Sequence, residues 1–103
     1  MFTKEDYIRF ALAYKQRAYE YWYTGKPQYA FANKKMEVIS LLKAEILSAN
    51  EEMKDKIAFD LEDPTELVKM FKSYCPEAYN KVHKKLLKRF SRLEYSWVFV
   101  PEQ

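Results

Sequence analysis

Six basic side chains lie close together late in the chain, and cations at such spacing bind phosphate or carboxylate groups. If the segment is helical, four of them fall on one line at about 100° per residue, and the other two flank that line. No acidic residue interrupts residues 81–92. The six, called the basic stripe, are Lys81, Lys84, Lys85, Lys88, Arg89 and Arg92. The stripe predicts a nucleic-acid site or a site for another acidic partner, unless it only solvates the helix.

Three alternatives for the stripe stay open from the sequence. Residues 51–66 are strongly acidic and could pair with the stripe in the same molecule or in a second copy, so a homodimer is one alternative. A helix-turn-helix outline over residues 64–92 favours nucleic acid, although the expected turn glycine is absent. A third alternative is a membrane surface, because Phe90 and Trp97 lie near the cations.

Cys75 and His83 are the residues with the best side chains for nucleophilic or metal chemistry. On one helix, eight residues separate them by about 12 Å, which is too far for a hydrogen bond between the two. No Cys or His pair has the spacing of a zinc site, and the single glycine rules out a phosphate-binding loop of the common type. We therefore expect a non-enzymatic protein with no catalytic residues, metal or cofactor, and a half-buried structural Cys75.

Four aromatic residues cluster within five positions. They are Tyr19, Tyr21, Trp22 and Tyr23. Because neighbouring helical residues point in different directions, at least one of these rings should be exposed. Aromatic rings are enriched where proteins contact each other, so the cluster predicts a protein-partner contact.

The elements that position these residues are expected to be helices. Thr3 and Asp6 have the spacing of a capping box, and Gly25 with Pro27 ends the first helix near Thr24. Its inward side alternates large and small residues at helical spacing, Tyr7, Ala11, Tyr14, Ala18 and Tyr21. Further apolar residues widen that side to roughly 200°, so the helix should touch two neighbours or a partner chain. These residues are Ile8, Leu12, Tyr19 and Trp22.

A second helix is predicted from Pro27 to at least Ala49, with a break near Asn50. Leu41 should point outward. The residues expected inward, or beside the inward side, are Tyr29, Ala32, Met36, Ile39, Leu42, Ile46 and Leu47. The connection over 57–63 should be anchored by Ile57, Phe59 and Leu61.

A third, short helix is predicted to begin after Asp63, because a cap, Pro64 and Glu66 follow one another as at a helix start. It should run to about Tyr74. The last helix is predicted over 76–97, with the basic stripe beside an apolar face. The inward residues of these two helices are Leu67, Val68, Phe71, Tyr79, Val82, Leu86, Phe90, Leu93 and Trp97.

Together these patterns predict one all-α domain over residues 1–103, a small irregular bundle of about four mostly antiparallel helices. The single cysteine and the absence of a secretory signal favour the cytoplasm. In size, charge and helical content the chain is similar to bacteriocin immunity proteins, with no shared motif. The expected function is binding of a protein partner, as an inhibitor, adaptor or immunity protein. The alternative is a nucleic-acid-binding regulator that uses the basic stripe.

Overall fold

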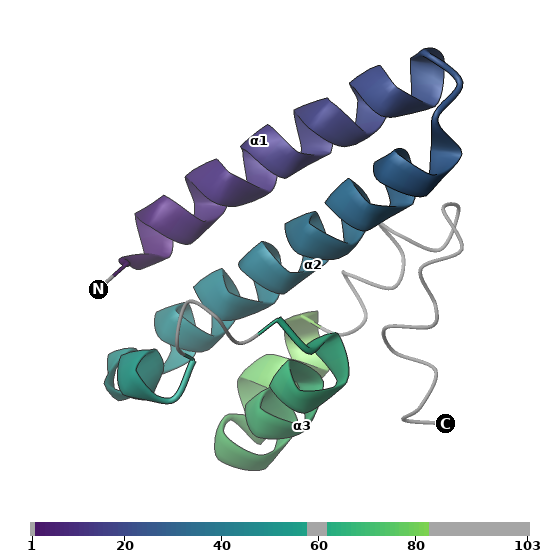
Figure 1. Ribbon diagram of the computed structural model, residues 1–103. Helices are drawn as coiled ribbons and strands as arrows, with labels where there is room; N and C mark the ends of the chain where they lie inside the picture. Colours follow the sequence, from purple (N-terminus) through teal and green to yellow (C-terminus); the bar gives the residue numbers. More distant parts are fainter. Residues whose placement is uncertain (1, 58–61, 83–103) are drawn as a thin grey trace.

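A computed structural model describes residues 2–57 and 62–82 of the chain (Figure 1). The elements are helix α1 (Lys4–Tyr23), helix α2 (Pro27–Ala49), the 3-10 helix η1 (Glu51–Asp55) and helix α3 (Pro64–Tyr74). Residues 76–82 are helical as well, and within the described ranges there is no strand. The predicted all-α bundle is confirmed.

Helix α1 begins and ends where its capping residues predict. The Asp6 amide donates a hydrogen bond to Thr3 Oγ1 at 3.2 Å, and the Thr3 amide donates to Asp6 Oδ2 at 2.8 Å, which completes the capping box. At the other end Gly25 has a φ of 76°, a left-handed conformation that suits glycine. The Lys26 amide then donates to the Tyr21 carbonyl at 2.9 Å, so the chain reverses into α2.

Helices α1 and α2 form an antiparallel hairpin (Figure 1). Lys4 Nζ donates to Ser48 Oγ at 3.3 Å near one end, and the rings of Tyr21 and Tyr29 lie 5.3 Å apart near the other. Ala11 and Ala18 are buried on the inward side of α1, where their small side chains let α2 approach closely.

Helix α2 is the central element, and in its second half nearly every side is covered. The predicted inward residues Ile39, Leu42 and Ile46 are buried, and so is Leu47. Two predictions for its first half are wrong, because Tyr29 and Ala32 are exposed. The core cluster takes its α2 members only from Val38 onward, so residues 29–32 lie beyond it. Leu41 was also wrongly predicted to point outward.

Leu41 is half-buried and packs against the core. It lies on the same side of α2 as the buried Ala30, Glu37 and Ala44, at helical intervals of seven, four and three residues. This side is the one that α1 covers, since the Ser48 that contacts Lys4 continues it. The prediction that α2 buries a single face is therefore wrong, because several elements pack around this helix.

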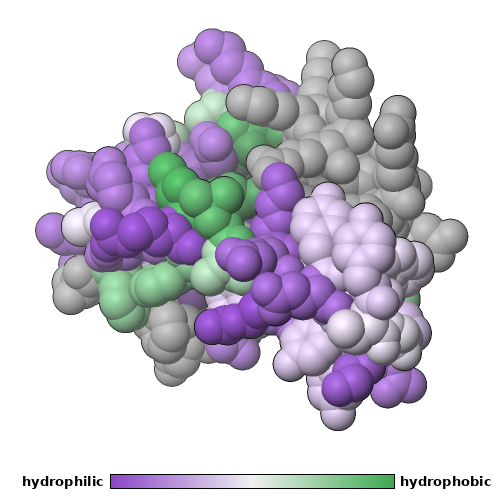
Figure 2. Space-filling model, turned by 90° about the horizontal axis from the view of Figure 1, so that it is seen from above, coloured by the Kyte–Doolittle hydropathy of each residue, from purple (hydrophilic) through white to green (hydrophobic). Residues whose placement is uncertain are grey.

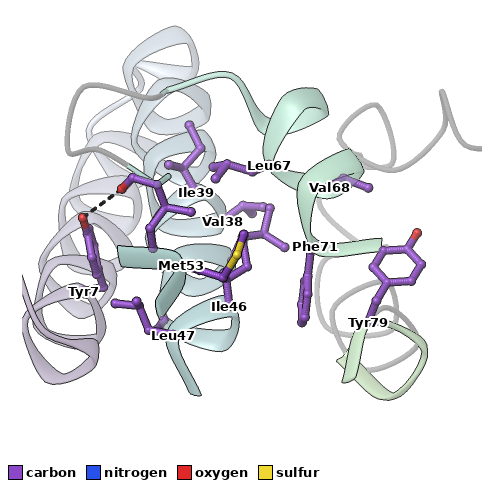
Figure 3. Close-up of a cluster of buried hydrophobic side chains, with 13 residues drawn as sticks. Tyr7, Val38, Ile39, Ile46, Leu47, Met53, Leu67, Val68, Phe71 and Tyr79 are labelled. Atoms are coloured by element: carbon purple, nitrogen blue, oxygen red, sulfur yellow. Dashed lines mark hydrogen bonds between the residues drawn. The ribbon is translucent and has the colours of Figure 1, made fainter. Parts of the chain in front are cut away.

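The predicted break near Asn50 is confirmed, and the segment that follows it packs into the core that α2 shares. Asn50 Oδ1 accepts a hydrogen bond from the Glu52 amide at 3.0 Å, which starts η1. Met53 and Ile57 then belong to the same buried cluster as Ile46 and Leu47, and Figure 3 shows Met53 close to Ile46. Phe59 and Leu61, the other predicted anchors, lie outside the described residues.

Helix α3 covers another side of α2. Asp63 Oδ1 accepts from the Thr65 amide at 3.0 Å, which confirms the predicted cap. The three residues predicted inward are buried, namely Leu67, Val68 and Phe71. The Phe71 ring meets the Tyr79 ring edge-on at 5.8 Å, which ties residues 76–82 to α3 (Figure 3).

Candidate protein-binding face

The outer face of α1 carries large apolar and aromatic side chains that the bundle does not cover. Leu12 is 58% exposed and Tyr23 is 81% exposed. On a helical wheel Ile8, Leu12, Tyr19 and Tyr23 fall within about 60° of one another. They lie about 130° from the inward side of α1, called the seam, which consists of Tyr7, Ala11, Tyr14, Ala18 and Tyr21. The four side chains, called the outer face, thus form a second apolar stripe that points away from α2.

The outer face is hollowed along its second half. An open hollow is lined by Leu12, Lys15, Gln16, Tyr19, Glu20, Tyr23 and Thr24. The Tyr19 and Tyr23 rings stack beside it, with centroids 6.5 Å apart and planes 22° apart. Figure 2 views the molecule from the α1 side and shows hydrophobic and near-neutral surface side by side, with hydrophilic atoms between them.

The aromatic cluster predicted at the end of α1 divides between two environments. Tyr19, Trp22 and Tyr23 are exposed, which confirms that at least one ring would be. Tyr21 is half-buried, as expected for the seam it also belongs to. Trp22 lies 6.0 Å from the exposed Phe31 ring of α2, so exposed aromatic surface continues across the hairpin.

A buried ion pair on α2 lies next to the outer face, and it was not predicted from the sequence. Lys34 Nζ lies 2.8 Å from Glu37 Oε1, with side chains 7% and 1% exposed. The same Nζ lies 4.9 Å from the centre of the Tyr19 ring, a distance at which cation and ring attract each other. Lys34 and Glu37 lie on the same side of α2 as the buried Ala30 and Ala44. Two opposite charges at helical spacing between apolar residues are a sequence pattern that could have predicted this pair.

The ends of the face carry opposite charges. Glu5 and Asp6 lie in the first turn of α1, and Lys26 follows the helix. The hydrogen bond from the Thr3 amide, together with Arg9, holds the pKa of the Asp6 carboxyl below its ordinary value. Asp6 is therefore negative at neutral pH and fixed in its cap. On the outer face itself, Glu5 places an acid at the beginning, and Lys26 places a base just beyond the end.

The basic stripe lies almost entirely outside the described residues. Lys81 is exposed on the helical residues 76–82. The other five cations are outside the described ranges, namely Lys84, Lys85, Lys88, Arg89 and Arg92. His83 lies outside them too, while Cys75 is half-buried against the core with a free thiol. Whether residues 51–66 cover the stripe therefore stays a prediction.

The acidic residues do not gather into a metal site in the part of the chain that the structure describes. Within it, no group of three or more His, Cys, Asp or Glu side chains has the arrangement to hold a metal ion. Of the helices searched there, none has the length and apolar character needed to cross a membrane. Comparisons with protein-family models, curated proteins and solved structures find no match to this chain.

Proposed function

We propose that this chain acts by binding another protein along the outer face of α1, as an inhibitor, adaptor or immunity protein does. The supporting observation is the exposure of Leu12, Tyr19 and Tyr23 on a helix that is already docked by its opposite side. Exposed large apolar side chains gathered on one rigid helix are typical of protein interaction sites.

The aromatic residues suit that role for a physical reason. A Tyr or Trp ring buries a large area on binding while it loses few rotatable bonds, so such rings often dominate the binding energy. The Tyr19 and Tyr23 rings stack on each other, and the Lys34 ammonium lies 4.9 Å from the centre of the Tyr19 ring. We place this role in the cytoplasm, where a single free cysteine stays reduced.

Site-specific photo-crosslinking tests the proposal. A photoreactive amino acid placed at Tyr23 should give discrete protein adducts in native cells, and the same amino acid at the exposed Ala13, on another side of α1, should not. Leu12→Glu in the same chain should remove the adducts, because it puts a charge in the centre of the face. Equal adducts from both positions, or adducts that survive Leu12→Glu, would refute the role of this face.

A further inference from the structure

We propose that the outer face of α1 binds a second copy of this chain, in antiparallel orientation, about a two-fold axis between Lys15 and Gln16. This inference rests on the proposed function, because it names the partner of the same face. It follows from a symmetry in how side chains are spaced along α1.

The side chains along the face repeat in mirror order about that midpoint. From the start to the midpoint the face has an acid, two apolar residues and a polar residue, at intervals of three, four and three: Glu5, Ile8, Leu12 and Lys15. From the end back to the midpoint it has a base, two aromatic residues and a polar residue at the same intervals: Lys26, Tyr23, Tyr19 and Gln16. Seven of these eight residues are exposed and Lys15 is half-buried.

An antiparallel second copy matches this order residue by residue. Ile8 of one copy meets Tyr23 of the other, and Leu12 meets Tyr19, and the two-fold axis makes each contact twice. Aliphatic groups against aromatic rings pack well. A parallel copy would instead place Glu5 against Glu5 and Lys15 against Lys15, so like charges would repel at both sites.

The charges at the ends of the face favour the same orientation. The antiparallel copy brings Glu5 to the end of the helix where Lys26 lies, again at two symmetric places. Within residues 2–57 and 62–82 neither side chain has an ion-pair partner. Each is exposed, so pairing needs no burial of charge.

The hollow has a counterpart on the second copy as well. Its lining residues lie between positions 12 and 24 of the chain, on α1 and at its C-terminal cap. In the antiparallel register these positions face residues 7–19 of the other copy, which include the exposed Ile8 and Leu12. Each copy would therefore insert two aliphatic side chains beside the stacked Tyr19 and Tyr23 rings of the other.

The size of the face sets the strength of such a dimer. Residues 5–26 span about 32 Å along a helix, and one helix face of that length covers several hundred Å² on each copy. Standard stable interfaces bury about 800 Å² on each partner, so the pair is below that class. We expect a weak dimer with a micromolar dissociation constant.

Sedimentation velocity on the full chain between about 5 and about 500 μM protein, at low salt, tests the dimer in this concentration range. The wild type should shift from monomer to dimer. Leu12→Glu should stay monomeric throughout. Glu5→Lys alone and Lys26→Glu alone should each weaken the dimer by about tenfold, because each places like charges together at two sites. Circular dichroism checks that every variant keeps its helices.

The double variant Glu5→Lys with Lys26→Glu should return the dissociation constant to within about threefold of the wild type, since it restores opposite charges. A double variant no tighter than the singles overturns the antiparallel register, and so overturns the proposal. A dimer unchanged by Leu12→Glu also overturns it. If the wild type stays monomeric while Tyr23 still gives adducts that Leu12→Glu removes, the self-association is wrong and the proposed function stands.

Discussion

The Tyr7 hydroxyl donates a hydrogen bond to the backbone carbonyl of Ile57 at 3.5 Å, although fifty residues separate them along the chain. The bond is buried and joins the first turns of α1 to the segment after η1 (Figure 3). Tyr7 and Ile57 belong to the same buried cluster as Met53 and Leu47, so the bond lies within the core.

Tyr7→Phe removes that hydroxyl and should lower the free energy of unfolding by about 0.5–1 kcal/mol, because the bond is long and its loss leaves a buried carbonyl without this donor. Urea denaturation at neutral pH measures the change. Tyr23→Phe is the matched control, since its hydroxyl is on an exposed ring, and it should leave the unfolding free energy unchanged. Equal effects from the two variants would contradict the structural role of the Tyr7 bond.

The same variant has a pH signature. Burial raises the pKa of the Tyr7 phenol, and the nearby Asp6 charge adds to the increase. A group whose pKa is raised by folding stabilises the folded state below its unfolded pKa of about 10, and that stabilisation is lost as pH rises through the folded value. Wild type should therefore lose more stability than Tyr7→Phe between about pH 9 and pH 11. Parallel denaturation curves at the two pH values would contradict this prediction.

The buried pair of Lys34 and Glu37 predicts an asymmetry between single and double substitutions. Glu37→Ala should cost about 3–5 kcal/mol, because it leaves the buried Lys34 ammonium without this carboxylate. Lys34→Met with Glu37→Leu should be close to neutral, since apolar side chains of similar volume replace both charges. Chemical denaturation measures both. A double variant as unstable as Glu37→Ala would contradict the prediction that apolar side chains can replace both charges.

Substitutions at the neighbouring positions Leu12 and Ala11 of α1 should have different effects on the free energy of unfolding. Leu12→Glu should change the unfolding free energy by no more than about 0.5 kcal/mol, because the side chain is exposed. Ala11→Leu should destabilise by about 1–3 kcal/mol, because it overpacks the seam against α2. Thermal unfolding of both variants tests the assignment of the two faces. A large loss of stability in Leu12→Glu would mean that the outer face is part of the core.

The alternative role of the basic stripe is tested by salt dependence. If the chain acts through a protein partner, a nucleic-acid duplex of mixed sequence should bind weakly to the wild type. It should bind equally weakly to the double variant Lys85→Glu with Lys88→Glu. Phosphate contacts by several cations would instead weaken steeply between about 50 and about 200 mM salt. Fluorescence anisotropy at the two salt concentrations measures this. Salt-sensitive binding that the variant loses would favour nucleic acid over the proposed function.

The helices were predictable because their ends carry strong local chemistry. Thr3 with Asp6, Gly25, Asn50 and Asp63 each satisfy or redirect backbone groups within three residues, so the sequence contains the whole interaction. Burial on α2 was less predictable because it depends on which other elements pack there. Leu41 and Glu37 lie on the side of α2 that carries the buried Ala30 and Ala44, and that spacing indicates a covered side without saying which helix covers it.

The candidate site was partly predictable for a related reason. The sequence predicts an apolar side of α1 that is too wide for one neighbour, and Tyr19, Trp22 and Tyr23 are exposed as that width implies. Which part of the wide side would remain uncovered depended on where α2 docks. The Lys34 contact with Tyr19 joins two helices, so only the folded chain places the two residues together.

The central position of α2 has a consequence for how the molecule opens. Backbone amides between Glu37 and Leu47 can exchange with solvent deuterium only when α1, η1 and α3 have all left, so their exchange should require global unfolding. Amides in the last turn of α1, next to the exposed Gly25 turn, should exchange through local fraying and at rates that denaturant scarcely changes. The turn end of the hairpin can then open and close many times while the rest of the bundle stays folded.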